Sequence, residues 1–401
     1  MTARLWRGTR PTLFEAMRRA VAADGMKIPL SGPDITAVER RAVLDVLESS
    51  NLSLGPKLVE FEQAMAKYVR VRHAVAVNSG ASGLQLIVRA LGIGPGDEVI
   101  TTPFSFIASA NCIVVEGARP IFADIEPGTY NIDVTKIEHA ITPRTKAILG
   151  VDVFGRCADW ERIEAIAQRH RLAVIEDSCE ALGGVSRRRK AGSFGDAGCF
   201  AFYPNKQMTT GEGGMILTDR DDLAAACRSM RNQGREDGEG WLQHARLGFN
   251  YRLSDLNCAL GLAQLSRLED MLARRAAVAA LYLERLRAIE DVVLPPPVKE
   301  GRLSWFVFVM RLADRYRRTD RDLVLQGLRE AGIGCSNYFP PIHLQTYYAE
   351  RFGHRPGDFP VTERVAERTI ALPFFNALTA VQVDEVVDCL AHQIRLVRCH
   401  R

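Results

Sequence analysis

Residues 193–218 read SFGDAGCFAFYPNKQMTTGEGGMILT, and this stretch decides the fold expected for the whole chain. Its pattern predicts a strand over 198–203, a tight loop that carries Lys206, and a second strand over 214–218. A lysine held between two buried strands is desolvated, which lowers the pKa of its amine and makes it a nucleophile. Most lysines near a strand end point into water instead, so this stretch alone leaves both interpretations of Lys206 open.

The composition is that of a globular protein long enough for two domains. The chain has 401 residues, of which 47% are hydrophobic and 25% charged, and its formal net charge is +4. This balance argues against a nucleic-acid-binding protein, and no apolar run approaches the roughly 20 residues of a membrane span. The nine cysteines form no CxxC pair, which favours free buried thiols in a reducing cytoplasm over disulfides or a metal site. We therefore predict a cytoplasmic protein without metal that binds neither nucleic acid nor membrane.

Residues 1–27 are expected to form an N-terminal extension. Residues 1–12 hold three arginines and no acid, and a loosely attached helix over 13–22 is favoured over a transit peptide. We place a large α/β domain over 28–260 and a smaller α+β domain over 261–401, with the first helices of the large domain packed against the smaller one.

Short apolar runs alternate with helical patterns through the first half of the chain. We expect strands over 73–77, 98–102, 119–123, 145–153 and 172–175, and helices over 34–49, 56–68, 84–91, 105–115, 134–141 and 159–171. Asp34 is a candidate N-cap of the first of these helices. This alternation predicts a parallel sheet covered by helices on both faces. In the last part we expect helices over 253–267, 271–289, 321–331 and 381–396 and a strand over 305–311.

Polar residues follow several of these strands, where ligands bind in open α/β sheets. Residues 78–83 (NSGASG) lie between a strand and a helix, so they fit either an anion site or an ordinary capped turn. Asp177 closes the strand at 172–175, about 30 residues before Lys206. An isolated aspartate there often caps a turn, but both residues follow strands of one sheet, so we predict that they face one crevice.

Three other segments carry less information about function. The run 92–97 (GIGPGD) follows a helix and precedes a strand, the reverse of a dinucleotide-binding loop, so it is predicted to be a turn. The four cations at 187–190 lie in a hairpin, where a solvated turn is favoured over a diphosphate contact. Residues 231–241 are polar and glycine-rich and are predicted to form a mobile loop.

Four motifs resemble, in order and spacing, the DegT/DnrJ/EryC1/StrS family of sugar aminotransferases, within the fold-type I pyridoxal-phosphate (PLP) enzymes. The motifs are SGAS at 79–82, EDSCE at 176–180, SFGD through FYPNK to GEGG at 193–214, and GFNYRLS at 248–254. The third is highly specific, and the resemblance runs from about Ile28 to the C-terminus. It implies a mostly parallel seven-stranded sheet in the large domain and a smaller α+β C-terminal domain.

The resemblance implies a role for the residues around the cofactor ring. Lys206 would hold PLP as an imine and move a proton during catalysis. Asp177 would keep the pyridine nitrogen protonated, so that the ring acts as an electron sink. Phe106 would cover one face of the ring, and Glu180 would lie near the ring oxygen.

The resemblance also implies how the cofactor phosphate and the substrates are bound. Gly80, Ala81 and Ser82 would bind the phosphate at a helix start, and Asn250 would reach the phosphate of the neighbouring subunit's cofactor. A homodimer with shared active sites follows. In relatives, certain segments line the sugar and nucleotide site. In this chain those segments contain Arg235, Arg252, Tyr338 and His343.

The implied function is transfer of an amino group from an amino acid to a 3- or 4-keto nucleotide-linked sugar. L-Glutamate is the expected donor, and pyridoxamine phosphate is the intermediate form of the cofactor. A keto-cyclitol acceptor and a non-catalytic regulatory protein that binds PLP or a nucleotide sugar are the alternatives. Three positions depart from the family pattern. Where this chain has Ala201, Ala81 and Glu180, many relatives have Ser, Thr and Gln, respectively. The sugar dehydratases of the family have His at the position of Lys206, so Lys206 argues against that branch.

Overall fold

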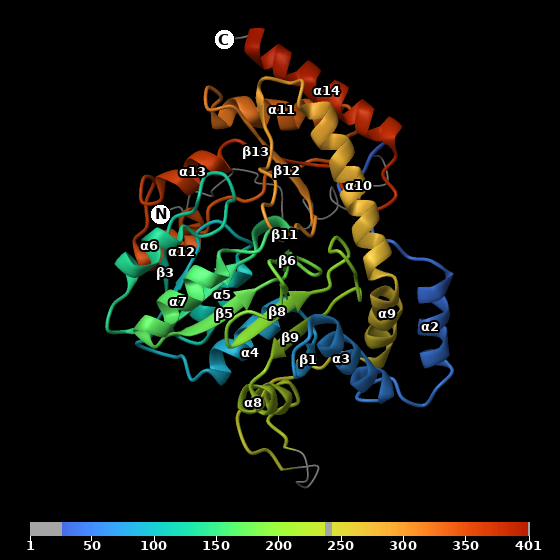
Figure 1. Ribbon diagram of the computed structural model, residues 1–401, viewed down its shortest axis with the longest axis vertical. Coiled ribbons are helices and arrows are strands. Elements are labelled where there is room, and N and C mark those ends of the chain that lie inside the picture. The colour runs from blue at the N-terminus through green and yellow to red at the C-terminus, as the bar shows by residue number, and fades with distance from the viewer. Residues whose placement is uncertain (1–25, 237–242, 400–401) are drawn as a thin grey trace, which may run out of the picture.

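The computed structural model describes residues 26–236 and 243–399 of the chain. A large part built on a central sheet lies at the bottom of Figure 1, and the C-terminal third forms a smaller part at the top. The helix predicted over 13–22 lies outside the described residues, as do residues 237–241 of the predicted polar loop. The predicted extension and the two domain boundaries stay predictions.

The large part is built on a seven-stranded sheet. Its strands lie in the order β1 (His73–Val77), β9 (Gly214–Thr218), β8 (Ala197–Ala201), β5 (Ala173–Asp177), β4 (Thr145–Val151), β2 (Glu98–Thr101) and β3 (Arg119–Phe122). Within this sheet, β9 runs antiparallel to both neighbours, whereas the other adjacent pairs are parallel. The predicted mostly parallel seven-stranded sheet is therefore confirmed.

Helices cover both faces of this sheet (Figure 1). They are α3 (Pro56–Val69), α4 (Gly80–Ala90), α5 (Ala108–Val115), α6 (Val134–Ala140), α7 (Trp160–His170), α8 (Asp221–Arg231) and α9 (Asp255–Ser266). Successive side chains of a strand point to opposite faces, so in β4 Leu149 packs in one core with α4 and α5, and Ile148 packs in another with α6 and α7. The fully apolar strands of the sequence are explained by this double burial.

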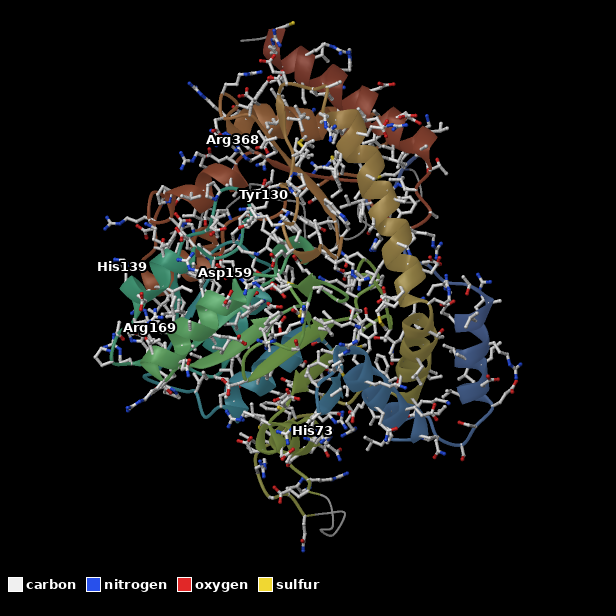
Figure 2. All side chains as sticks on the ribbon, viewed as in Figure 1. His73, Tyr130, His139, Asp159, Arg169 and Arg368 are labelled. Atoms are coloured by element: carbon white, nitrogen blue, oxygen red, sulfur yellow. The ribbon has the colours of Figure 1, made fainter. Side chains whose placement is uncertain are left out.

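The smaller part has its own core around a three-stranded sheet. Its elements are α10 (Leu268–Leu286), β10 (Val292–Val293), β12 (Phe308–Leu312), α11 (Arg318–Glu330), β13 (Thr369–Leu372) and α14 (Ala380–Cys399). Strand β12 separates the two cores, because Val309 packs in the core of the large part and Phe308 in that of the smaller part. Tyr130, labelled in Figure 2, is buried on the Val309 side and lines a small cavity with it. The strand was predicted over 305–311, so its predicted start lies three residues before the observed start and its predicted end one residue before the observed end.

The remaining elements are short: β6 (Val185–Ser186), β7 (Arg189–Lys190), β11 (Gly301–Arg302), η2 (Val153–Gly155), η3 (Ile342–Leu344), α12 (Thr346–Phe352) and α13 (Pro360–Ala366). The cationic run at 187–190 forms the predicted hairpin, in which Arg187 pairs with Glu161 at 2.6 Å and Arg189 with Glu164 at 2.8 Å. Within residues 26–236 and 243–399, no helix is both long and apolar enough to cross a membrane. All nine cysteines lie among the described residues and are free.

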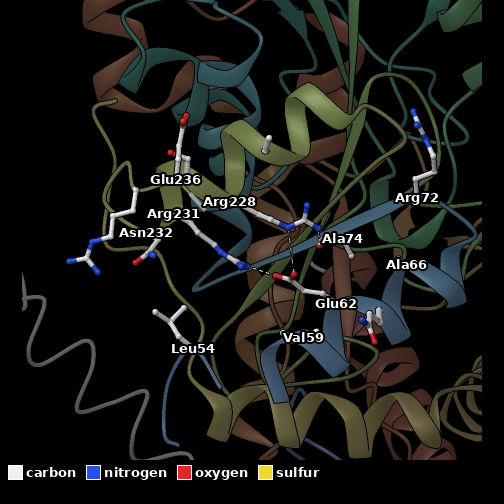
Figure 3. Close-up of a pocket in the computed structure, with 14 residues that line it drawn as sticks. Leu54, Val59, Glu62, Ala66, Arg72, Ala74, Arg228, Arg231, Asn232 and Glu236 are labelled. Carbon is white, nitrogen blue, oxygen red and sulfur yellow. Dashed lines mark hydrogen bonds and ion pairs between the residues drawn. The ribbon is translucent and has the colours of Figure 1, made fainter. Parts of the chain in front are cut away.

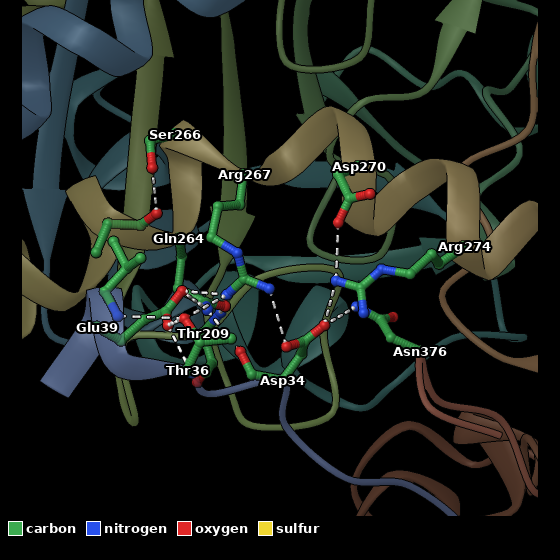
Figure 4. A network of polar contacts seen from close by, with 12 residues as sticks. Asp34, Thr36, Glu39, Thr209, Gln264, Ser266, Arg267, Asp270, Arg274 and Asn376 are labelled. Carbon is green, nitrogen blue, oxygen red and sulfur yellow. Dashed lines mark hydrogen bonds and ion pairs between the residues drawn. The ribbon is translucent and has the colours of Figure 1, made fainter.

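A polar network ties helix α2 (Ala37–Leu47) to the corner between α9 and α10, as Figure 4 shows. The N-cap of α2 is Thr36, which forms a capping box with Glu39, and not the predicted Asp34. The Asp34 carboxylate instead pairs with Arg267 at 3.1 Å and with Arg274 at 2.7 Å. Partners more than 200 positions away in the sequence therefore bind Asp34, and the local capping box at Thr36 begins the helix.

Candidate active site

Asp177 and Lys206 meet because their strands are neighbours. Strands β5 and β8 are parallel and Asp177 pairs with Cys199, so both strands end at the same edge of the sheet. Asp177 is the last residue of β5, and the loop after β8 carries Lys206. Both residues line one cavity of about 610 Å³. The predicted shared crevice is present in the structure.

The Asp177 carboxylate is held rigidly at the bottom of this cavity. Only 5% of the residue is exposed. Ser109 donates its hydroxyl to Oδ2 of Asp177 at 2.6 Å, and the backbone N–H of Cys179 donates to Oδ1 at 3.2 Å. A carboxylate fixed in this way is prepared to receive a further donor from the cavity.

The Lys206 side chain is 13% exposed and is bordered by an aromatic ring and an acid. Its Nζ lies 3.9 Å from the centroid of the Phe306 ring and 4.0 Å from Oε1 of Glu180. Sequence reasoning missed Phe306, which lies 100 positions after Lys206. The one available signal was an aromatic pair, Trp305 and Phe306, beside the start of a predicted strand.

Glu180 is an acid with a perturbed pKa inside the cavity. It is 6% exposed, and its Oε2 accepts the backbone N–H of Phe154 at 2.9 Å. Burial raises the pKa of Glu180 to about 7, against the opposing effect of the Lys206 charge. Burial also raises the pKa of Tyr338, which lines the same cavity and lies near the Glu180 charge.

The opposite side of the cavity is a helix start. Helix α4 begins at Gly80, and as first residues Gly80 and Ala81 have N–H groups without an intrahelical acceptor. The Ser82 N–H instead bonds to the Ser79 hydroxyl at 3.0 Å, and Ser82 does not line the cavity. A Cβ on Gly80 would lie 2.8 Å from the Cβ of Ala201, so a side chain there would fill the space between helix and strand.

The groups that line the cavity fit PLP. A helix start with free N–H groups suits its phosphate, a buried carboxylate suits its pyridine nitrogen, and an amine suits its aldehyde carbon. Phe106 supplies an aromatic ring that is 62% exposed and faces the cavity. Of the predicted site residues, those that line the cavity are Gly80, Ala81, Phe106, Asp177, Glu180, Lys206 and Tyr338.

The other predicted residues lie elsewhere. Asn250 is exposed and pairs through its backbone with Asn232, to whose side chain Arg252 donates at 3.1 Å. Arg235 lines a separate cavity of about 870 Å³ beside α3 and α8 (Figure 3). His343 is fully buried outside the Lys206 cavity.

His343 occupies a closed, mostly aromatic environment. Its Nε2 lies 3.0 Å from Oε1 of Glu363, and its ring packs edge-on against Phe359. Burial lowers the pKa of His343, and Glu363 opposes this shift. A direct contact between His343 and a substrate would require the surrounding segment to open.

Two buried carboxyl groups lie directly behind Asp177. The Ser178 Oγ is 2.5 Å from Asp152 Oδ2 and 2.5 Å from Glu176 Oε1. One hydroxyl hydrogen cannot serve two acceptors, so one carboxyl group must hold a proton. Burial raises the pKa of Asp152 to about 6, and burial and the charge of Asp152 raise the pKa of Glu176 well above its usual value. The two carboxyl groups therefore share a proton across the Ser178 hydroxyl.

Asp152→Asn is expected to flatten the pH dependence of stability. The unfolded chain loses the Asp152 proton near pH 4 and the folded protein near pH 6. The free energy of unfolding of the wild type should therefore fall across this window, by on the order of 2 kcal/mol from this group. Urea unfolding of both proteins from pH 4 to pH 8, with Asp45→Asn as a surface control, measures the difference. Parallel curves for wild type and Asp152→Asn would contradict a raised pKa.

Comparison with known proteins assigns the chain. The profile of the DegT/DnrJ/EryC1/StrS aminotransferase family matches residues 33–391. The chain belongs to this family. The GDP-perosamine synthase of Caulobacter vibrioides is 40% identical over 370 residues, with 92% of this chain and 98% of that protein covered. The spore coat polysaccharide biosynthesis protein SpsC of Bacillus subtilis is 39% identical over 373 residues, with 90% and 96% covered.

A solved structure supports the same assignment. The PLP form of Spr1654 from Streptococcus pneumoniae superposes with a TM-score of 0.88 at 27% identity, over 92% of this chain and 99% of that chain. Together with the family match, this confirms the resemblance and the fold class expected from the sequence. The protein is a PLP-dependent sugar aminotransferase.

Proposed function

We propose that the protein transfers an amino group from L-glutamate to a 3- or 4-keto group of a nucleotide-linked sugar. The main support is that the Lys206 amine, the Asp177 carboxylate and the helix start at Gly80 line a single cavity. The names of two relatives support the proposed acceptor class, because one is a GDP-perosamine synthase and the other a spore coat polysaccharide biosynthesis protein. A GDP-linked keto sugar is therefore the first acceptor to test.

In this proposal the chain binds the cofactor and moves protons around it. When bound, PLP supplies an electron sink for the amino acid's α-carbon. Asp177 Oδ2 or Oδ1 holds the proton of the pyridine nitrogen. Lys206 Nζ takes the proton from the α-carbon of the donor and later delivers a proton to the carbon that receives the amine. Glu180 and Phe306 orient Nζ through the contacts at 4.0 and 3.9 Å.

Pyridoxamine phosphate is the proposed second form of the cofactor, between donor and acceptor. We also keep the proposal of a homodimer in which the exposed Asn250 serves the neighbouring subunit's phosphate. The residues proposed to contact the nucleotide sugar are Arg235, Arg252, Tyr338 and, once the segment around it opens, His343. The cytoplasm is the proposed location, in line with nine free cysteines.

The spectrum of the purified protein tests this proposal. The PLP-loaded protein is expected to be yellow, and excess L-glutamate should bleach the band as the cofactor takes up the amino group. Adding a GDP-linked keto sugar should restore the band and yield an aminated sugar detectable by mass spectrometry. A spectrum that L-glutamate leaves unchanged would count against the proposed donor. Restoration by a keto-cyclitol and not by the nucleotide sugar would change the acceptor class.

A further inference from the structure

Arg275 on helix α10 is a deeply buried arginine. The residue is 3% exposed, and burial lowers the pKa of its guanidinium to about 10, with the charge of Asp34 opposing. Among the described residues it forms no ion pair. Its sequence neighbour Arg274 differs in every respect, since its side chain is 38% exposed and pairs with Asp34 and Asp270 at 2.7 and 2.9 Å. Burying an unpaired charge is costly, so the position of Arg275 requires an explanation.

The guanidinium of Arg275 binds the main chain at the lysine of the active site. Its Nη2 donates to the carbonyl oxygen of Asn205 at 3.1 Å and to that of Lys206 at 3.0 Å. Its Cζ lies 5.4 Å from the centroid of the Phe374 ring. Within the described part of the chain, Nε and Nη1 of Arg275 have no hydrogen-bond partner. The polar contacts of this buried cation are therefore directed at the lysine turn.

These contacts connect the lysine turn to a rigid element of the smaller part. Helix α10 is 19 residues long, and its later turns place Val278 and Tyr282 in the core around Phe308. The backbone N–H of Lys206 donates to the carbonyl of Tyr203 at 2.9 Å, so the turn is closed on one side by its own chain. On the other side its carbonyl groups are held by Arg275. The origin of the Lys206 side chain is thus fixed by a group 69 positions away.

We propose that Arg275 is a positioning residue, which holds the backbone of Lys206 so that Nζ reaches the aldehyde carbon of PLP. A guanidinium suits this task, because it is planar and presents several donors in a fixed geometry. The inference rests on the proposed role of Lys206. It predicts different effects on the two cofactor forms. PLP binding requires the amine of Lys206 to be placed correctly, whereas pyridoxamine phosphate has no aldehyde and requires only the cavity.

The test compares the binding of the two cofactor forms by the full-length protein after removal and re-addition of cofactor. Arg275→Met is expected to raise the apparent Kd for PLP at least about tenfold, because two charge-assisted hydrogen bonds are lost. The Kd for pyridoxamine phosphate should rise less than about threefold. Equal losses for both forms would overturn the proposal, because they would show a generally loosened cavity. No loss for either form would overturn it as well.

Two matched variants separate positioning from stability. Arg321 is also a buried arginine, 4% exposed, that donates to main-chain carbonyls, those of Ala366 and Thr369, away from the lysine turn. Arg321→Met should lower stability as much as Arg275→Met but leave the ratio of the two Kd values unchanged. Arg274→Met removes the neighbouring surface cation and should also leave the ratio unchanged. A change of the ratio in either control would overturn the assignment to Arg275.

Two further variants keep the test decisive. Should Arg275→Met fail to fold, Arg275→Lys serves, because its ammonium ends one bond short of the position of Nη2, which weakens both contacts and should cost PLP binding about threefold. An unchanged ratio in Arg275→Lys together with failure of Arg275→Met would assign Arg275 to stability alone and overturn the proposal. Lys206→Ala should raise the Kd for PLP relative to the Kd for pyridoxamine phosphate. An unchanged ratio of the two Kd values in Lys206→Ala would refute the role of Lys206 itself, an outcome distinct from an unchanged ratio in the Arg275 variants.

Discussion

Lys206→Ala is expected to lower the rate of amino transfer by at least about 10⁴-fold while the protein still binds pyridoxamine phosphate. The variant loses both the amine that attaches the cofactor and the group that moves the proton, and general acid–base catalysis alone contributes about 10²–10⁴-fold. The 13% exposed side chain fills a space of the cavity that alanine leaves open, so binding of an intact cofactor is not obstructed. Single-turnover measurements with L-glutamate give the rate, and absorbance gives the bound cofactor.

A surface lysine provides the control for Lys206→Ala. Lys57 has a side chain that is 37% exposed and pairs with Glu60 at 2.7 Å, and it does not line the cavity. Lys57→Ala should keep the wild-type rate and spectrum. If Lys206→Ala retained a rate within tenfold of the wild type, another group would have to move the proton. If it lost the binding of pyridoxamine phosphate as well, the substitution would have damaged the cavity and not only the chemistry.

The parts of this site that the sequence predicts are those set by strand order. Apolar runs bounded by glycine-rich turns predict the parallel sheet, and the ends of neighbouring parallel strands must lie at one edge. Asp177 and Lys206 are therefore predictable as a pair, even though the strand before Lys206 ends at Ala201 and not at 203. A family motif then narrows the chemistry to PLP.

Side chains contributed by distant parts of the chain are not predictable in this way. Phe306, just before β12, contacts the Lys206 amine, and Arg275 of α10 binds the Lys206 carbonyl. The periodicity of the sequence does not specify which face of either segment meets the lysine. The sequence pattern likewise does not show that Arg267 and Arg274 bind the Asp34 carboxylate, while Thr36 caps the helix. Sequence patterns describe local preferences, whereas these contacts depend on the packing of one part of the molecule on the other.

Asp177→Asn is expected to reduce kcat about 10²–10⁴-fold with a smaller effect on cofactor binding. The side chain keeps its shape, so its carbonyl oxygen still accepts a hydrogen bond from Ser109 or from the Cys179 backbone, which lie 2.6 and 3.2 Å from the carboxylate. A neutral amide cannot hold a proton on the pyridine nitrogen by charge, so the cofactor becomes a weaker electron sink. The kcat measured at saturating PLP separates this effect from loss of cofactor.

Ser109→Ala isolates the charge of Asp177 from its orientation. This variant removes the 2.6 Å hydrogen bond but leaves the carboxylate, and a loss of about tenfold is expected from one charge-assisted bond. Because Asp177 would serve the donor and the acceptor reaction alike, Asp177→Asn should slow two steps by similar factors: the bleaching of the PLP band by L-glutamate and the recovery of that band with a keto sugar. If Asp177→Asn slows only one of these steps, or loses no more activity than Ser109→Ala, the negative charge at Asp177 is not what activates the ring.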